Sequence, residues 1–239
     1  MDHRRRLYAE FTSTTKAAIS GESSMPCLAI ECSSDRRSVA VTCGTRSVAE
    51  TSHTSGRETP LLEMIDRVLQ AASLTPGDLT CLAVGLGPGS YTGVRIAIAT
   101  AQGWELAHRT PLIGIDSVQA IAFRAMESGQ RGSVAIVVDA HRDEFYVAEY
   151  NLGPGSLLCT APLRIAKRDD LSILVGRAVP LFGPDLERFQ LHGTCVVPDA
   201  VTLGKLAALH PTATASELLQ PIYLRSTTFA KPTTPPRVL

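Results

Sequence analysis

Residues 87–95 have the sequence Gly-Pro-Gly-Ser-Tyr-Thr-Gly-Val-Arg, and they stand between an apolar run at 81–85 and a long segment with helical spacing. This order predicts a buried strand, a tight loop and a helix over about 92–108. Glycines let the backbone approach a neighbour closely, and Ser90 or Thr92 can cap the free N–H groups at the helix start. Such a terminus can hold a phosphate, although neither a Walker P-loop nor Gly-x-Gly-x-x-Gly is present. The loop is therefore either a phosphate cradle or a structural turn with a cap.

The helix behind the loop carries small residues at regular spacing. Gly93, Ala97 and Ala101 lie four residues apart and form one ridge, while Ala99 and Gly103 form a second. Ridges of small residues let another helix pack closely. That neighbour is either another element of the same fold or a helix of a second chain, and the spacing leaves both open.

The surrounding segments predict an α/β chain. Three short strands with polar turns form an antiparallel meander, a helix with one apolar face follows, and another strand and helix come after the loop. Strand and helix alternating at this pace indicate parallel crossovers. The expected elements are strands at 28–30, 38–42, 46–52, 81–85 and 112–115 and helices at 59–73, 92–108 and 117–127.

The opening pattern occurs a second time. An acidic residue ends a strand and is followed by a polar turn and another strand, first at Glu31 and again at Asp139. This repeat predicts a duplicated fold, with a first half at 25–130 and a shorter, less regular second half at 131–239. The further elements expected in the second half are strands at 134–138, 145–150 and 179–183 and a helix at 203–209.

The charge balance bears on possible partners. Lys plus Arg and Asp plus Glu both number 23, so the net charge is zero. A protein that grips tRNA alone usually carries a basic excess or stripe, because phosphate neutralisation drives binding. We therefore expect any nucleic acid to be held mainly by a partner.

Cysteine usage and the N-terminal segment indicate a reducing, non-membrane setting. The six cysteines form no C-x-x-C pair, which favours buried thiols in a reducing cytoplasm. No apolar run approaches the roughly 20 residues that span a bilayer. Residues 1–24 are polar, so we expect a flexible tail, or a functional start at Met25.

The combination of several segments resembles the TsaB/YeaZ family across residues 25–229, nearly the whole chain. The resemblance implies an actin/Hsp70-like fold of two related halves and a role in making threonylcarbamoyladenosine in tRNA. It implies that TsaD transfers the group, that this chain pairs with TsaD, and that TsaE joins them, with tRNA bound through the complex. The matching segments are 87–95, Ala101-Gln102-Gly103, 111–114, Asp139-Ala140, Glu144, Tyr146 and 221–225.

The resemblance also implies a partner interface. The family's heterodimer is built from the first two helices of each subunit, which correspond here to 59–73 and 92–108. The implied interface positions are therefore Leu61, Ile65, Gly93, Ala97 and Ala101. Whether the chain also forms a homodimer stays open.

Nucleotide binding depends on the strand end and the loop. Family members usually end the first strand in Asp, but this chain has Glu31 there, and no lysine follows the loop. We expect no cofactor for the chain alone, and nucleotide only at a complex interface. The candidate nucleotide-binding positions are Glu31, Gly87, Gly89, Ser90 and Thr92.

Catalysis by the chain itself has little support in the sequence. TsaD-type enzymes carry a His-x-x-x-His metal pair, and alignment places Ser117 and Ile121 at those positions. Without that metal the transfer has no Lewis acid to polarise the carbamoyl carbonyl. The expected role is therefore a non-catalytic subunit. One alternative is a free-standing actin-fold ATPase or kinase; another is a glycoprotease-like hydrolase using Ser90, Asp139 and His141, though no Gly-x-Ser-x-Gly elbow is present.

Overall fold

The computed structural model describes residues 25–54 and 60–224 and contains two five-stranded sheets. The predicted tail at 1–24 lies outside the described residues. The first sheet has the order β3-β2-β1-β4-β5, with β1, β2 and β3 antiparallel and β4 and β5 parallel to β1. Its strands are β1 (Pro26–Glu31), β2 (Arg36–Cys43), β3 (Arg46–Thr54), β4 (Cys81–Gly85) and β5 (Leu112–Ile115).

The second sheet repeats this topology. Read from β8, its order is β8-β7-β6-β9-β10, again with three antiparallel strands followed by two parallel ones. This identity of order and direction confirms the duplicated fold expected from the repeat, while the boundary near residue 130 stays a prediction. The strands are β6 (Gly132–Asp139), β7 (Glu144–Gly153), β8 (Ser156–Lys167), β9 (Leu181–Gly183) and β10 (Thr194–Cys195).

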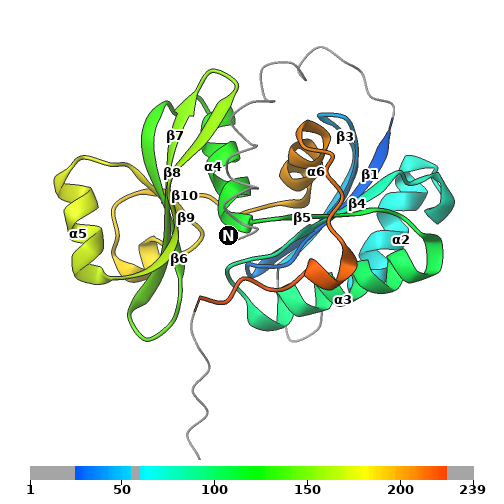
Figure 1. Ribbon diagram of the computed structural model, residues 1–239, viewed down its shortest axis with the longest axis horizontal. Helices are drawn as coiled ribbons and strands as arrows, with labels where there is room; N and C mark the ends of the chain where they lie inside the picture. Colours follow the sequence, from blue (N-terminus) through cyan, green and yellow to red (C-terminus); the bar gives the residue numbers. More distant parts are fainter. Residues whose placement is uncertain (1–24, 55–59, 225–239) are drawn as a thin grey trace, which may run out of the picture.

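Helices fill the space between the sheets and cover their outer faces, so that the molecule is built in layers (Figure 1). Helices α2 and α3 pack on the outer face of the first sheet, α5 packs beside the second sheet, and α4 and α6 lie between the sheets. The helices are α2 (Leu61–Ala72), α3 (Tyr91–His108), α4 (Ser117–Glu127), α5 (Arg168–Gly176) and α6 (Ala200–Leu209), with short 3-10 turns at Pro76–Asp78, Glu187–Phe189 and Ser216–Leu218.

The two central helices are exchanged between the halves. Helix α4 follows the first sheet in sequence but contacts β6, β7, β8 and β9, whereas α6 follows the second sheet and contacts all five strands of the first. Both helices are rich in buried residues and contribute to one core that is shared by the inner faces of both sheets. The apolar surface buried in this core therefore joins the two halves.

Two separate cores lie on the outer faces. The core of the first half is formed by β1, β2 and β4 against α2 and α3. Five residues of α2 are buried at helical spacing, which agrees with its amphipathic sequence (Leu61, Met64, Ile65, Val68 and Leu69). A smaller core on the second half packs α5 against β6, β7 and β8.

Candidate functional site

The Glu31 carboxylate lies at the carboxyl end of β1, the place where parallel α/β sheets commonly hold ligands. Its side chain is completely buried. The backbone N–H of Ser33 donates to Oε1 at 2.6 Å, and the Ser117 hydroxyl donates to Oε2 at 2.8 Å. A Cβ atom on Gly85 would lie 2.2 Å from Oε2, so the longer side chain fits only because β4 ends in glycine. Glu31 is thus held by the protein's own groups.

Burial sets the protonation of this group. It raises the pKa of Glu31, because the charged form loses its hydration, and the hydrogen bonds from Ser33 and Ser117 oppose the shift. A carboxyl whose pKa is higher in the folded state binds more protons when folded. Glu31 therefore stabilises the folded state most at low pH. This contribution of Glu31 is lost as pH rises from the ordinary pKa of a glutamate through the raised one.

Replacing Glu31 by glutamine tests this arrangement. The wild-type free energy of unfolding should decrease as pH rises above the ordinary pKa of a glutamate, and Glu31→Gln should remove that decrease because its amide stays neutral. Urea unfolding of both proteins across the acidic and neutral range measures the difference. Parallel pH profiles for the two proteins would contradict a buried, titrating Glu31.

The glycine loop packs against the turn that follows β1. The N–H of Ser90 donates to the Ser33 carbonyl at 2.6 Å. Added Cβ atoms on Gly89 and Gly93 would each lie 2.0 Å from a carbonyl oxygen, that of Ser33 or of Cys32. The glycines of the motif therefore allow two backbone segments to touch.

The start of α3 is capped from within the chain. The Ser90 side chain accepts a hydrogen bond from the Gly93 N–H at 3.3 Å, as expected for an N-cap residue. Gly87 is tied to the start of α4, because its N–H donates to the Ser117 hydroxyl and its carbonyl accepts from the Ser117 N–H. Thr92 is exposed on the first turn of α3. These contacts favour the structural interpretation of the loop, and nucleotide binding at these positions stays a prediction.

The five implied interface positions lie inside the first half. Leu61, Ile65, Ala97 and Ala101 belong to its buried core, and Gly93 is buried against Cys32. This placement corrects the expectation that they contact a second chain. The small side chains serve the fold itself, because they let α3 pack closely on the sheet.

The second ridge of α3 faces outward. Ala99 and Gly103 are exposed, and a Cβ atom on Gly103 would meet nothing within 4 Å. Ile96 is 37% exposed and Leu106 is 88% exposed. Together with Thr92, these residues recur at alternating spacings of four and three, the pattern of a helix that docks along a seam. We call Thr92, Ile96, Ala99, Gly103 and Leu106 the outer face of α3.

An aromatic pair closes one end of this outer face. The Tyr91 ring lies 5.0 Å from the ring of Tyr223, and the Arg95 guanidinium lies 5.2 Å from the Tyr91 centroid. Both tyrosines are exposed in part. The sequence could not predict this pair, because the two rings come from distant segments. The only signal was that both segments, 87–95 and 221–225, belong to the family resemblance.

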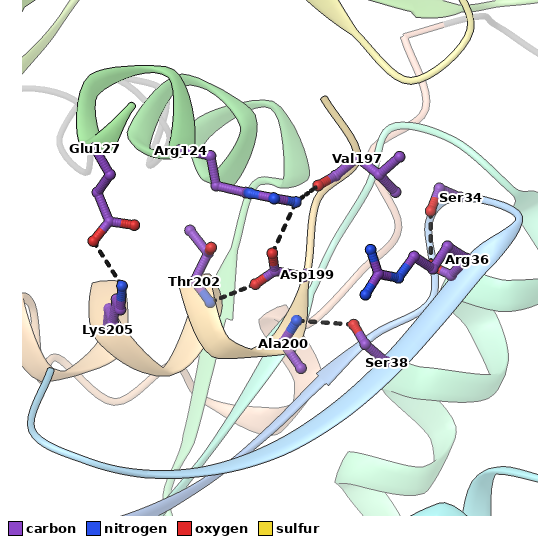
Figure 2. A network of polar contacts seen from close by, with 10 residues as sticks. All are labelled: Ser34, Arg36, Ser38, Arg124, Glu127, Val197, Asp199, Ala200, Thr202 and Lys205. Carbon is purple, nitrogen blue, oxygen red and sulfur yellow. Dashed lines mark hydrogen bonds and ion pairs between the residues drawn. The ribbon is translucent and has the colours of Figure 1, made fainter. Parts of the chain in front are cut away.

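A polar network joins α4 to the start of α6 (Figure 2). Arg124 pairs with Asp199 at 2.9 Å and donates to the Val197 carbonyl, while Lys205 pairs with Glu127 at 2.6 Å. Beside this network, Arg36, Ser38 and strand β3 line a polar pocket of about 280 Å³. These contacts fix the exchanged helices to each other. Sequence reasoning missed them, because the partners are far apart in the chain.

Among residues 25–54 and 60–224, no cluster of three or more His, Cys, Asp or Glu side chains is arranged to hold a metal ion. Within the same described ranges, no helix combines the length and the apolar character needed to cross a membrane.

Comparison with known proteins identifies the relatives of this chain. Residues 51–174 match the family model described as TsaD: tRNA N6-adenosine threonylcarbamoyltransferase. The tRNA threonylcarbamoyladenosine biosynthesis protein TsaB of Escherichia coli is 38% identical over 90 residues, which are 38% of this chain and 39% of that protein. The TsaB protein of Haemophilus influenzae is 37% identical over 89 residues, 37% of this chain and 38% of its own length. The match thus spans about two fifths of these curated relatives.

Longer matches extend the similarity over most of the fold. An uncharacterized protein of Mycobacterium bovis is 31% identical over 157 residues, 66% of this chain and 69% of that protein. The structure of YeaZ from Pseudomonas aeruginosa superposes with a TM-score of 0.72 at 25% identity, covering 84% of this chain and all of YeaZ. Together with the duplicated sheet topology, this confirms the actin-like fold. The chain belongs to the TsaB/YeaZ family.

Proposed function

We propose that this chain is a non-catalytic subunit that supports TsaD in transferring threonylcarbamoyl to adenosine in tRNA. The names of its curated relatives and the description of the matching family model support this process. In this proposal the transfer takes place in the cytoplasm, and tRNA is bound through the complex. The neutral net charge agrees with a subunit that does not grip nucleic acid alone.

The contacts of Ser117 and Ile121 support the proposal that this chain is not the catalyst. These are the positions at which TsaD-type enzymes carry their histidine pair. The Ser117 hydroxyl donates to Glu31 and accepts from the Gly87 N–H, and Ile121 is fully buried in the central core. Both positions are used for packing and for internal hydrogen bonds. A hydroxyl and an alkyl side chain in this setting do not replace two imidazole ligands.

The outer face of α3 is the docking surface in this proposal. Exposed Leu106 and Ile96 supply apolar area, and Ala99 and Gly103 leave room for a close helix backbone. Leu62 of α2 adds a further exposed apolar side chain. TsaD is the proposed occupant, TsaE binds the resulting pair, and a second copy of this chain is the competing occupant. Nucleotide, where it takes part, binds at the interface of the complex and not at the covered Glu31.

Reconstitution tests the proposed role. The purified chain alone should not modify tRNA, and it should restore modification when added to TsaD, TsaE and threonylcarbamoyl-adenylate from the same organism. The readout is modified adenosine in digested tRNA. Transfer by the lone chain would contradict a non-catalytic role, and unchanged transfer by TsaD and TsaE without the chain would contradict a supporting one.

A further inference from the structure

Two cysteines stand side by side at the starts of neighbouring strands. Cys27 in β1 and Cys81 in β4 are register partners in the parallel pairing of these strands. The backbone N–H and the hydroxyl of Thr80 both donate to the Pro26 carbonyl, at 2.9 and 3.0 Å, immediately before the two cysteines. The backbone thus holds the two Cα positions together.

Both thiols project from the same face of the first sheet. Register partners in paired strands point to the same side. Cys27 belongs to the central core, and Cys81 is partly buried against it. Cys43 follows Thr42, the β2 partner of Cys27, by one residue, so its side chain projects from the opposite face. The pair is therefore Cys27 and Cys81, without Cys43.

The backbone spacing suits a covalent link. Neighbouring strands lie about 4.8 Å apart. Cysteines in disulfides have Cα atoms separated by about 4.4–6.8 Å. A bond between these two sulfurs therefore requires side-chain rotation and no change in strand pairing.

The two thiols differ in reactivity. The hydrogen bond from Cys27 lowers the pKa of Cys81, and the same contact raises the pKa of Cys27 well above the usual value. The more exposed Cys81 is thus the better nucleophile, and buried Cys27 lies next to it. Elsewhere burial raises the pKa of Cys32 to about 12 and that of Cys159 to about 11. These thiols are less reactive.

We propose that Cys27 and Cys81 form a peroxide-sensitive thiol pair that closes to a disulfide, a modification independent of the function proposed above. The Cys81 thiolate attacks one peroxide oxygen, the O–O bond breaks, and water leaves after proton uptake, giving a sulfenic acid. The Cys27 sulfur then attacks the Cys81 sulfur. The S–O bond breaks as the S–S bond forms, and the Cys27 proton leaves with the hydroxide as a second water. The two sulfurs lose two electrons in total, and the peroxide gains them.

Peptide mapping of the full-length chain tests this pair. The folded protein is treated with hydrogen peroxide, remaining thiols are blocked, and the digest is analysed by mass spectrometry. We expect a cross-linked peptide that joins Cys27 to Cys81 and has lost two hydrogen atoms. Treatment with dithiothreitol should return both thiols. An unmodified Cys81 under conditions that oxidise exposed Cys195, or a link from Cys81 to any other cysteine, would overturn the proposal.

A variant and a matched control sharpen the result. Cys81→Ser should abolish the cross-link and leave Cys27 as a free thiol, because the buried Cys27 thiol is not the first to react. Cys195→Ser removes an exposed cysteine of the second half and should leave the cross-link at the wild-type level. Oxidation of Cys27 in Cys81→Ser as fast as in wild type would refute the assigned order. The wild-type mapping decides the proposal by itself if a variant does not fold.

Discussion

Replacing Ala97 by leucine is expected to lower the melting temperature of the isolated chain by roughly 2–12 °C. Ala97 is completely buried in the core between α3 and the first sheet. Overpacking a well-filled core typically costs about 1–3 kcal/mol, and each kcal/mol shifts the melting temperature of a chain this size by about 2–4 °C. Thermal unfolding followed by circular dichroism measures the shift.

Ala99→Leu is the matched control for this substitution. It adds the same side chain to the same helix two residues later, but Ala99 is exposed on the outer face. The isolated Ala99→Leu chain should therefore melt within about 1–2 °C of wild type, since exposed substitutions rarely exceed about 0.5 kcal/mol. If Ala97→Leu melted as high as this control, the ridge of Gly93, Ala97 and Ala101 would not face the core.

The two ridges of α3 show where sequence reasoning about this helix ends. The spacing of Ala97 and Ala101 correctly predicted one closely packed face, because small residues four apart share a helix face, but the neighbour is the sheet and not another helix. Ala99 and Gly103 show the same kind of composition on another face. The face that packs on the sheet is decided by Val94 and Ile98, which are buried on the side of Ala97. The interface positions that the family resemblance implied on α3 lie on this buried side of the helix.

The first half was predicted closely, and the second half was predicted in part, because strands β6, β7 and β9 and helix α6 were expected. The helix at Ser117–Glu127 and the strand at Leu112–Ile115 have the predicted bounds, because their apolar residues are nearly continuous and both faces are buried. Strand β8 and helix α5 were missed. β8 is an edge strand with alternating exposure and a proline at 162, and α5 buries only Leu171 and Leu174. The hydrophobic periodicity of such segments is too weak to distinguish them from loops in the sequence.

Glu31 illustrates a site property that depends on a distant residue. The sequence shows a glutamate where an aspartate is usual, which predicts a disturbed nucleotide position. It does not show that Gly85, on the neighbouring strand, leaves room for the longer side chain to fold back. It also does not show that Ser117, at the start of α4, completes the hydrogen bonds of the carboxylate. The covered state of Glu31 follows from these tertiary contacts alone.

Replacing Gly103 by arginine is expected to weaken TsaD binding by at least tenfold, a loss of about 1.4 kcal/mol or more. Gly103 lies in the middle of the outer face, where an added side chain meets no atom of this chain. In the proposed complex the same space is filled by a partner helix. An arginine there would separate the two backbones and place a charge in an apolar contact. Titration calorimetry with TsaD measures the affinity.

The isolated Gly103→Arg chain should be as stable as wild type or more stable. Arginine favours the helix over glycine by up to about 1 kcal/mol, and no core contact is disturbed. Gly176→Arg is the matched control. Gly176 is the last residue of α5, and an added side chain there also meets no atom of this chain. Helix α5 lies far from α3 in the layered fold (Figure 1). This control should bind TsaD with wild-type affinity. Wild-type affinity in Gly103→Arg would remove the outer face from the proposed interface. Equal weakening by both variants would show that added charge acts at a distance, because the two positions share no surface.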